Sequence, residues 1–409
     1  MKALYVSYDG MTDPLGRSQV LPYLQGLAAR GHEITLLSCE KPERSTDETA
    51  VRAICERAGI DWRPVAYHKW PPIVSGIVDV TVLKCEAARL HRIKRFDLVH
   101  CRSYMAAIAG DWLKRRHGVP FLFDMRGFWA DERVERGIWR TGNPLFRAAY
   151  SYFKRLERRL FRDADAIVSL TDNARGEIES WPADRRPTAP ITVIPCCVEL
   201  KLFAERSTES RAATRRQLGI DENAPVLLYV GSVGGAYLMT EMFRLFETYR
   251  EIHPRARFLF ITGHPSEEVE RLAMEQGVKP AELVVVSAKR DEVPNLIAAA
   301  DIGVSFILAT YSAKASCPTK FGEMLAMGVP VIANGGVGDI AEIIHETGAG
   351  AVVERYDRAS LSTAIAQAKA AAKDRDSIRA AAIRYFDLDA GVDRYDAIYR
   401  SIERDQKLS

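Results

Sequence analysis

The segment Ser316-Cys-Pro-Thr-Lys-Phe-Gly-Glu323 combines groups that are suited to binding a nucleotide diphosphate. A loop with a proline here leads into a predicted helix, whose first turn offers Thr319, Lys320 and free backbone N–H groups. Glu323 lies one turn after Lys320 on the same helix face, so its carboxylate is placed to accept ribose hydroxyls while Lys320 faces phosphates. A capped helix with an ordinary Lys–Glu pair explains the local pattern equally well. The strand predicted after the helix, at 330–336, favours the ligand site, because it places the helix between two strands.

Two further segments of the same half offer phosphate ligands. Gly231 and Ser232 open a glycine-rich loop after the predicted strand 226–231, and glycines let backbone approach a pyrophosphate closely. Lys289 and Arg290 follow the predicted strand 283–288 and supply alternative cations. A solvated turn is the competing interpretation of this basic pair.

The first half of the chain also places polar residues beside predicted strands. Arg17, Ser18 and Gln19 are predicted to begin a helix, which would make a second anion site. We interpret Asp9 and Asp13 as turn residues.

Strand ends in this half carry a second set of candidates. His100 lies near the end of the predicted strand 97–101 and Arg102 follows that strand, and His100 has either a structural or a ligand-binding role. Asp124 and Arg126 come at the end of the next strand and form either an internal ion pair or a site for the hydroxyls and phosphate of a ligand. Trp129 strengthens the interpretation as a binding loop, because aromatic faces cover the C–H groups of sugars.

The segment 144–162 has the pattern of an amphipathic helix. Its apolar stripe consists of Phe146, Ala149, Phe153, Leu156 and Leu160. The arginines lie largely off that stripe, so the helix either packs on the first sheet or also contacts an anionic membrane surface.

These candidates are positioned by strands that alternate with helices, which predicts an α/β fold with parallel sheets covered on both faces. One series of strands is predicted at 3–7, 33–38, 97–101, 120–125 and 166–170, and a second at 226–231, 256–263, 283–288, 302–308 and 330–336. The boundary is predicted within 191–210, and residues 385–409 form one or two terminal helices. Open parallel sheets bind ligands at the carboxyl ends of their strands.

Composition narrows the protein class. A chain of 409 residues predicts two domains, and a net charge of +3 argues against a nucleic-acid partner. The seven cysteines have no C-x-x-C spacing, and no secretion leader or membrane-spanning run is predicted, so we expect a cytoplasmic protein. A G-x-G-x-x-G motif after the first strand and a D-x-D motif on a strand-end loop are both missing, which disfavours a dehydrogenase and a metal-dependent transferase.

Three segments resemble glycosyltransferase family 4. They are Glu323-Met-Leu-Ala-Met-Gly-Val-Pro-Val-Ile-Ala, the opening YDGMTDPLGRSQVLPYL, and the terminal helix. The resemblance implies the GT-B fold, with two Rossmann-like, doubly wound parallel-sheet domains facing across a cleft. Residues 1–200, completed by a helix at 390–409, would form the acceptor-side domain, and residues 201–389 would form the donor domain.

The resemblance also implies an activity, namely retaining transfer of a sugar from a UDP- or GDP-sugar without a metal or other cofactor. The acceptor would be a saccharide or lipid-linked saccharide of surface polysaccharide or glycoconjugate synthesis. The family's Glu-x7-Glu motif places its second Glu at Glu323 and its first at Ala315, so one donor-sugar contact is lost or replaced. Ser232 stands where an arginine is expected, which leaves Lys320 as the main cation.

The expected site residues therefore fall into three groups. For catalysis we expect His100, Lys320 and Glu323; for donor binding Gly16, Gly231, Ser232, Lys289, Arg290, Ser316, Thr319, Lys320 and Glu323; and for acceptor binding Arg17, Arg102, Asp124, Arg126 and Trp129. A nucleotide-sugar epimerase on the same scaffold and a non-enzymatic two-domain ligand-binding protein are the alternatives.

Overall fold

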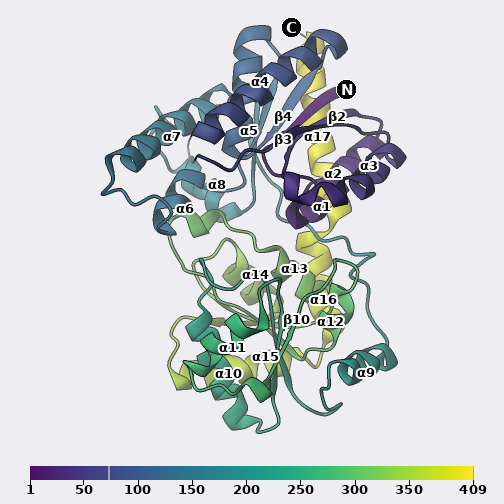
Figure 1. Cartoon of the computed structure of the whole chain (residues 1–409), viewed down its shortest axis with the longest axis vertical. Helices are drawn as coiled ribbons and strands as arrows, with labels where there is room; N and C mark the ends of the chain where they lie inside the picture. Colours follow the sequence, from purple (N-terminus) through teal and green to yellow (C-terminus); the bar gives the residue numbers. More distant parts are fainter. Residues whose placement is uncertain (72–73, 409) are drawn as a thin grey trace. The chain divides into compact units, whose positions relative to one another are not determined.

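The computed structural model of the chain describes residues 1–71 and 74–408 (Figure 1). The chain divides into two compact units. Unit 1 consists of Met1–Pro195 together with the segment from Leu388 onward, and unit 2 is Cys196–Asp387. The first boundary therefore lies inside the segment 191–210 that the sequence singles out.

Unit 1 is built on a seven-stranded parallel sheet. Its strand order is β3-β2-β1-β4-β5-β6-β7. The strands are β1 (Lys2–Ser7), β2 (Glu33–Glu40), β3 (Asp61–Ala66), β4 (Leu98–Arg102), β5 (Phe121–Asp124), β6 (Ala166–Ser169) and β7 (Ile191–Val193). The inner strands are buried almost throughout, because helices cover both faces of the sheet.

Nine α-helices are described in unit 1. They are α1 (Pro14–Gln19), α2 (Leu21–Ala29), α3 (Glu48–Arg57), α4 (Val74–Lys94), α5 (Ser103–His117), α6 (Trp129–Glu135), α7 (Pro144–Asp163), α8 (Asp172–Glu179) and α17 (Leu388–Leu408). The last of these, α17, packs on α2. Its residues Tyr395, Ile398, Tyr399 and Ile402 are buried, and they are the residues that helical spacing selects.

Unit 2 has a six-stranded parallel sheet in the order β10-β9-β8-β11-β12-β13. Its strands are β8 (Val226–Val230), β9 (Arg257–Ile261), β10 (Leu283–Val286), β11 (Ile302–Ser305), β12 (Val331–Asn334) and β13 (Gly350–Val353). Its helices are α9 (Thr208–Gln217), α10 (Met239–Ile252), α11 (Ser266–Met274), α12 (Val293–Ala298), α13 (Thr319–Ala326), α14 (Ile340–Thr347), α15 (Arg358–Ala371) and α16 (Arg375–Phe386).

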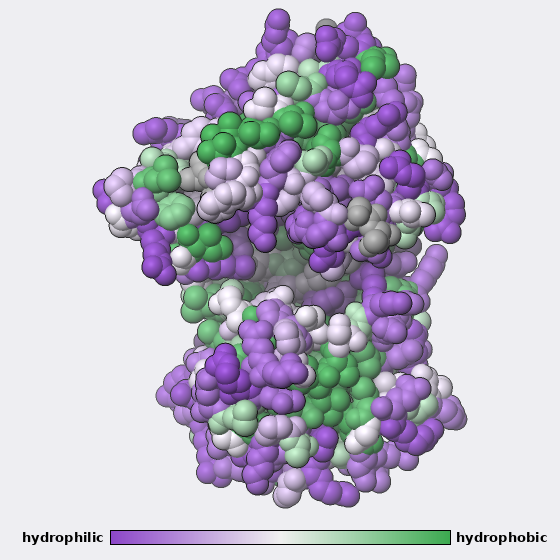
Figure 2. All heavy atoms as spheres, viewed as in Figure 1, coloured by the Kyte–Doolittle hydropathy of each residue, from purple (hydrophilic) through white to green (hydrophobic). Residues whose placement is uncertain are grey.

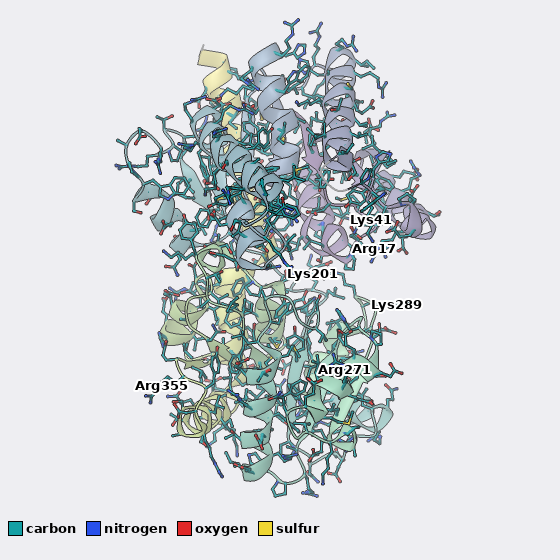
Figure 3. All side chains as sticks on the ribbon, turned by 60° about the vertical axis from the view of Figure 1, so that its left-hand side comes forward. Arg17, Lys41, Lys201, Arg271, Lys289 and Arg355 are labelled. Atoms are coloured by element: carbon teal, nitrogen blue, oxygen red, sulfur yellow. The ribbon has the colours of Figure 1, made fainter. Side chains whose placement is uncertain are left out.

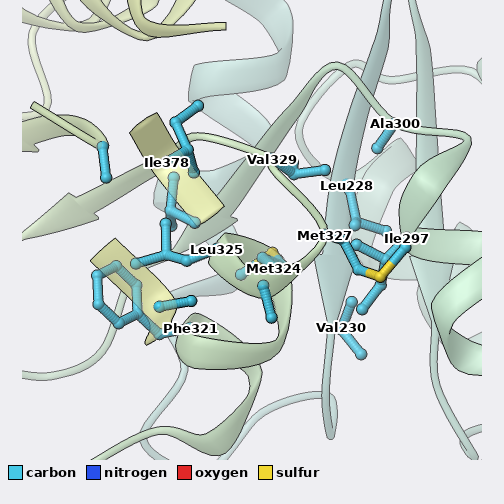
Figure 4. Close-up of a cluster of buried hydrophobic side chains, with 14 of the residues drawn as sticks. Leu228, Val230, Ile297, Ala300, Phe321, Met324, Leu325, Met327, Val329 and Ile378 are labelled. Carbon is cyan, nitrogen blue, oxygen red and sulfur yellow. The ribbon is translucent and has the colours of Figure 1, made fainter. Parts of the chain in front are cut away.

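Helix α13 is anchored in the core of unit 2. Phe321, Met324 and Leu325 are at most 1% exposed and pack among residues of neighbouring strands and of α16 (Figure 4). Burying three large side chains of an eight-residue helix stabilises its position by several kcal/mol, at about 1.5–3 kcal/mol each. The polar face of α13 is therefore held in a fixed orientation.

The exterior of the chain is mainly polar on the face that Figure 2 shows, with an apolar strip over α4. Val74, Ile77 and Val78 of α4 are 54%, 63% and 43% exposed.

The ten predicted strands are all present, with ends that differ by at most three residues. Three strands were not predicted: β3, β7 and β13. All three lie at sheet edges, where half-exposed residues weaken the apolar pattern. β3 even contains Pro64, which an edge strand tolerates.

The first predicted helix needs a correction. Helix α1 begins at Pro14, so Arg17, Ser18 and Gln19 end this helix instead of opening one. Pro14 stands at the first helical position, where its fixed φ and missing N–H favour initiation. Pro22 stands in the first turn of α2 and cannot donate a helical hydrogen bond, so a continuous helix through residues 14–29 is interrupted.

Candidate functional site

Each sheet has a switch point in its strand order. In unit 1 the switch lies between β1 and β4, and in unit 2 it lies between β8 and β11. Loops that leave these neighbouring strands run to opposite faces of the sheet, which leaves room for a ligand at the carboxyl edge.

In unit 2, backbone hydrogen bonds join the loops that follow β8 and β11. Leu238 N donates to Phe306 O (3.0 Å) and Leu308 N donates to Ala236 O (2.8 Å). The loop after β8 turns at Gly234 and Gly235, whose φ angles of 80° and 68° favour glycine. At the switch point of unit 2, the two loops are therefore held together by backbone hydrogen bonds.

Gly231 and Ser232 begin this loop. A Cβ at Gly231 would lie 2.8 Å from Tyr229 Oη, whose hydroxyl donates to the Ser232 carbonyl (2.5 Å). Ser232 is exposed. Only a residue without a side chain fits against this tyrosine, so Gly231 keeps the backbone of the loop accessible.

The loop after β11 leads into α13, which begins at Thr319 as the sequence predicts. Glu323 is only 1% exposed and accepts a hydrogen bond from Lys320 Nζ (2.9 Å). Arg290 Nη1 lies 3.4 Å from the other carboxylate oxygen. Two cations therefore contact one buried carboxylate.

Arg290 and Lys289 differ sharply, although they are adjacent. Arg290 follows β10, lies 3.7 Å from Glu199 and stands over the ring of Phe203 at 5.7 Å. Lys289 has an exposed side chain, and its backbone N–H donates to Glu292 (2.7 Å; Figure 3 labels Lys289). The structure brings Arg290 to Glu323 and leaves the Lys289 side chain at the surface.

The remaining donor candidates lie at the start of α13. Ser316 and Thr319 are half-buried on either side of Pro318. The Cys317 thiol accepts a hydrogen bond from Cys196 N (3.3 Å), and its interaction with the Cys196 thiol together with burial raises its pKa. Ala315, at the position of the expected first glutamate, is 1% exposed.

In unit 1, Arg102 ends β4 beside the switch point. It is 4% exposed, and its Nε lies 3.3 Å from Asp9, which follows β1. Ser103 and Arg126 adopt left-handed φ angles of 65° and 58° directly after β4 and β5. Such conformations cost about 1–3 kcal/mol outside glycine and concentrate at functional sites. The carboxyl edge at β4 and β5 therefore carries local strain.

His100 lies in the interior of unit 1. It is 1% exposed, and its Nδ1 lies 2.9 Å from the hydroxyl of Tyr399 on α17. Burial lowers the pKa of His100, although Asp124 at 3.8 Å acts in the opposite direction. Side chains of α17 thus cover the ring.

Asp124 and Arg126 adjoin the same interior cluster. Asp124 is 1% exposed and accepts a hydrogen bond from Tyr395 (3.1 Å), while Arg126 Nη1 lies 3.7 Å away. Burial raises the pKa of Asp124, but Arg126, His100 and Arg102 outweigh burial and hold it below its usual range. Asp124 is therefore a buried carboxylate with cationic neighbours.

Trp129 begins α6 and is half-buried. Arg133 stands over its ring at 4.1 Å and lies 5.9 Å from the ring of Trp139, which itself contacts Trp129 edge to face at 5.3 Å. Asp131, two residues later on α6, accepts hydrogen bonds from Tyr150 and Lys154 of α7 (2.8 Å each). Asp131 therefore ties α6 to α7.

Gly16 and Arg17 lie within α1. A Cβ at Gly16 would overlap the Gly10 carbonyl oxygen, so glycine is needed where this helix crosses the loop after β1. Arg17 lies 3.1 Å from Asp47 at the surface of unit 1 (Figure 3). Asp13 precedes α1 and pairs with Lys41 (2.8 Å), in keeping with its interpretation as a turn residue.

Sequence reasoning missed one cluster at the same edge of unit 1. His68 Nδ1 lies 2.6 Å from Asp79, which also accepts from Tyr8 Oη (2.9 Å). The available signal was Asp79 itself, a charged residue inside the apolar run Gly76-Ile-Val-Asp-Val.

Across residues 1–71 and 74–408 there is no group of three or more His, Cys, Asp or Glu side chains placed to hold a metal ion. Over that same part of the chain, none of the helices is both long and apolar enough to cross a bilayer.

Comparison with known families covers both halves of the chain. The "Glycosyl transferase 4-like domain" model matches residues 17–197, and the "Glycosyl transferases group 1" model matches residues 210–385. Together the matches extend over most of both units.

Curated relatives include D-inositol 3-phosphate glycosyltransferases. The protein from Nocardioides sp. is 24% identical over 320 residues, which cover 74% of this chain and 65% of the relative. That from Geodermatophilus obscurus is 26% identical over 303 residues, which cover 69% and 61%. The chain thus aligns with a little under two thirds of the length of these relatives.

Solved structures share the fold. Sucrose-phosphate synthase from Thermosynechococcus elongatus superimposes with a TM-score of 0.72 at 16% identity, covering 98% of this chain and 99% of the other. HepE from Anabaena, in complex with UDP-glucose, gives 0.70 at 14% identity, covering 98% and 100%. The chain therefore belongs to the group 1 glycosyltransferases of family 4, and its two parallel α/β units are the Rossmann-like domains of the GT-B fold.

Proposed function

We propose that the chain transfers a sugar from a nucleotide diphosphate sugar to a saccharide acceptor with retention of configuration, using unit 2 for the donor and unit 1 for the acceptor. The observation that carries the proposal is the Lys320–Glu323–Arg290 cluster at the head of α13, beside the switch point of unit 2.

This cluster suits a nucleotide diphosphate because its charges can rearrange. Lys320 and Arg290 would form ion pairs with phosphate oxygens in place of Glu323. The Glu323 oxygens would then accept hydrogen bonds from the ribose hydroxyls. The backbone N–H groups at the start of α13 and the loop at Gly231 and Ser232 would add donors to the phosphates. Ser316 and Thr319 flank the same helix start, and we assign them to the donor as well.

The same groups would act in catalysis. Charge develops on the leaving diphosphate, and Lys320 with the helix amides would stabilise it in the transition state. The acceptor hydroxyl attacks from the face that the diphosphate leaves, and a phosphate oxygen takes its proton. No protein nucleophile is assigned.

In unit 1 we assign Arg102, Arg126 and Trp129 to the acceptor. His100 and Asp124 are covered by α17, so we assign them to positioning Arg126 and Arg102 rather than to contact with the substrate. Gly16 is assigned to the close packing of α1 on the loop after β1.

The proposed donor is a UDP-sugar, and the proposed acceptor class is a saccharide or polyol that carries a phosphate, with a lipid-linked saccharide as the variant in surface polysaccharide synthesis. Support comes from the HepE structure with UDP-glucose and from the D-inositol 3-phosphate relatives. The seven free cysteines fit a reducing compartment such as the cytoplasm.

The test begins with thermal shift against UDP-, GDP- and dTDP-sugars, because a ligand that binds the folded chain raises its melting temperature. The stabilising donor is then incubated with and without acceptors, and the products are examined by mass spectrometry. We expect an anomerically retained glycoside. An epimerised nucleotide sugar without acceptor would support an epimerase instead, and binding without any product would support a ligand-binding protein.

A peripheral membrane contact is proposed for unit 1. Helix α7 buries Leu156 and Leu160, while its outer face exposes Leu145 and Tyr152. The exposed basic residues of this helix are Arg147, Arg155, Arg158 and Arg162. Apolar and basic side chains on one exposed helix face suit an anionic lipid surface. Co-flotation with vesicles that contain phosphatidylglycerol, but not with pure phosphatidylcholine vesicles, is the expected result.

A further inference from the structure

A second polar cluster lies at the carboxyl edge of the sheet in unit 1, on the loops that follow β1 and β3. We propose that His68, oriented by the buried Asp79, and Arg133, held over Trp129, bind an acceptor saccharide that carries a phosphate or carboxylate group. His68 would take an acceptor hydroxyl and Arg133 the anionic group. This inference rests on the proposed function and names the side chains that would recognise the acceptor and its anionic group.

Asp79 holds the ring of His68 in one orientation. Asp79 has no exposed side-chain surface and accepts three hydrogen bonds, from Tyr8 Oη (2.9 Å), His68 N (3.3 Å) and His68 Nδ1 (2.6 Å). An ionised carboxylate only accepts, so the Nδ1 proton lies toward Asp79. The free ring atom is then Nε2, on an imidazole that is 49% exposed.

Burying the Asp79 carboxylate costs free energy. A carboxylate on an apolar helix face loses its hydration, and its hydrogen bonds compensate this loss without adding stability. Burial and the hydrogen bond to Asp79 raise the pKa of Tyr8, so its hydroxyl stays a donor. A buried acid that fixes one exposed imidazole orients Nε2 for an outside group.

Arg133 lies in an aromatic environment. Its guanidinium stands over the ring of Trp129 at 4.1 Å and lies 5.9 Å from the ring of Trp139, and within the described structure its buried Nε has no hydrogen-bond partner. Burial lowers the pKa of Arg133, while Glu132 and the phenols of Tyr67 and Tyr8 act on it in the opposite direction. Tyr8, whose hydroxyl donates to Asp79, is thus a neighbour of both Arg133 and the His68–Asp79 pair.

The acids near Arg133 already have cationic partners. Of the nearby acids, Asp9 is taken by Arg102 (3.3 Å) and Glu132 by Arg136 (2.7 Å). This leaves Arg133 as a cation whose ion pair an incoming anion would supply. The rings of Tyr8 and Tyr67 stand 5.7 Å apart at 72° to each other, and aromatic rings of this kind pack against the C–H groups of sugars.

The test measures binding by calorimetry on the full chain saturated with UDP. The probes are glucose 1-phosphate and D-inositol 3-phosphate, with uncharged glucose and myo-inositol as their matched partners. We expect the phosphorylated probes to bind at least about tenfold more tightly than the uncharged ones, as a charge-assisted pair provides.

Variants separate the two residues. Arg133→Gln should remove the preference for phosphorylated probes, and Arg133→Lys should restore part of it. His68→Ala and Asp79→Asn should each weaken both probe types several-fold, with Asp79→Asn acting although the imidazole remains. The matched controls are Arg116→Gln and His117→Ala, which change an exposed arginine and an exposed histidine on α5.

Three outcomes would overturn the inference: equal affinity for charged and uncharged probes, unchanged preference in both Arg133 variants, or equal effects in the control variants. Circular dichroism identifies any variant that fails to fold, and Tyr8→Phe then replaces Asp79→Asn as the test of orientation. The same probes are also titrated without UDP. A chain that binds no nucleotide sugar but still prefers phosphorylated probes would sink the proposed transfer and leave this site standing.

Discussion

Glu323 and Lys320 form a hydrogen-bonded ion pair of 2.9 Å in which the acid is buried and the base is 36% exposed. A pair that served stability alone would gain little from this asymmetry, because a half-exposed lysine compensates a buried carboxylate incompletely. The arrangement keeps Lys320 available to a second anion. Its consequences for donor binding are directly measurable.

Lys320→Ala should lower turnover on the order of 100-fold, the loss found when one transition-state donor to a developing anion is removed. Donor affinity should fall as well, as measured by calorimetry with the UDP-sugar. The control is Arg271→Ala, which removes a cation from an exposed pair on α11 (2.6 Å to Glu275; Figure 3). Wild-type kinetics in Lys320→Ala would contradict the donor site.

Arg290→Ala should raise the donor KM about tenfold, because one charge-assisted contact to the diphosphate is lost. Lys289→Ala is the matched control, since this neighbour has the same charge and an exposed side chain. Steady-state kinetics at saturating acceptor distinguish the two. An equal rise of the donor KM in both variants would mean that the loop contributes only general positive charge and that Arg290 makes no specific contact with the donor.

Gly16→Ala should destabilise unit 1 by about 1–3 kcal/mol, because the added methyl overlaps the Gly10 carbonyl and the chain must move. Gly176→Ala, in the interior of α8 with open space around it, should instead be neutral or stabilising by up to about 1 kcal/mol. Calorimetric melting of both variants measures the contrast. Equal melting temperatures would show that α1 does not depend on this close contact.

Acidification from pH 8 to pH 5 should destabilise unit 1. The pKa of His100 is lowered in the fold from its ordinary 6.5, so below that pH the unfolded chain binds a proton at this site that the folded chain does not. The stabilisation is thus present above pH 6.5 and is lost as the pH falls. Asp124, whose folded pKa lies below its ordinary 3.8, acts in the same direction but only at lower pH.

The measurement is the melting temperature across this range for the wild type and for His100→Gln. Below pH 6.5, removing His100 should make the free energy of unfolding depend less steeply on pH, by up to about 1.4 kcal/mol per pH unit. The melting temperature of the variant should therefore fall less on acidification than that of the wild type. His32 and His91, whose pKa values are also lowered by burial, remain in both proteins and cancel in the difference. Parallel curves would contradict a buried, neutral His100.

Nine of the ten strands that the sequence predicts lie inside a sheet, where burial on both faces makes their apolar runs continuous. The tenth, β10, is an edge strand that was predicted because its run Leu-Val-Val-Val is apolar throughout. The edge strands β3, β7 and β13 escaped because exposure on one side removes that signal. The break at Val20 depends on two prolines, Pro14 and Pro22, whose effect on a helix is local and was therefore available from the sequence.

The donor cluster was only partly predictable. Lys320 and Glu323 follow from spacing within one helix, whereas the approach of Arg290 joins residues 33 apart and depends on how β10 and α13 pack. The contact between His68 and Asp79 likewise depends on how the segment after β3 packs against α4. His100 looked accessible at a strand end, and the side chain that covers it, Tyr399, comes 299 residues later.

The two ends of unit 2 meet. Val198 N donates to Phe386 O at 2.6 Å, and Val198 also bridges Asp387 just before α17 returns to unit 1. Unit 2 is therefore a complete insert whose fold does not require α17. Unit 1, although its larger part precedes unit 2 in the sequence, needs α17 to supply Tyr395 and Tyr399. A chain that stops at Asp387 should consequently protect unit 2 from protease while the earlier half stays sensitive, and donor specificity should be transferable between relatives by exchanging this one insert.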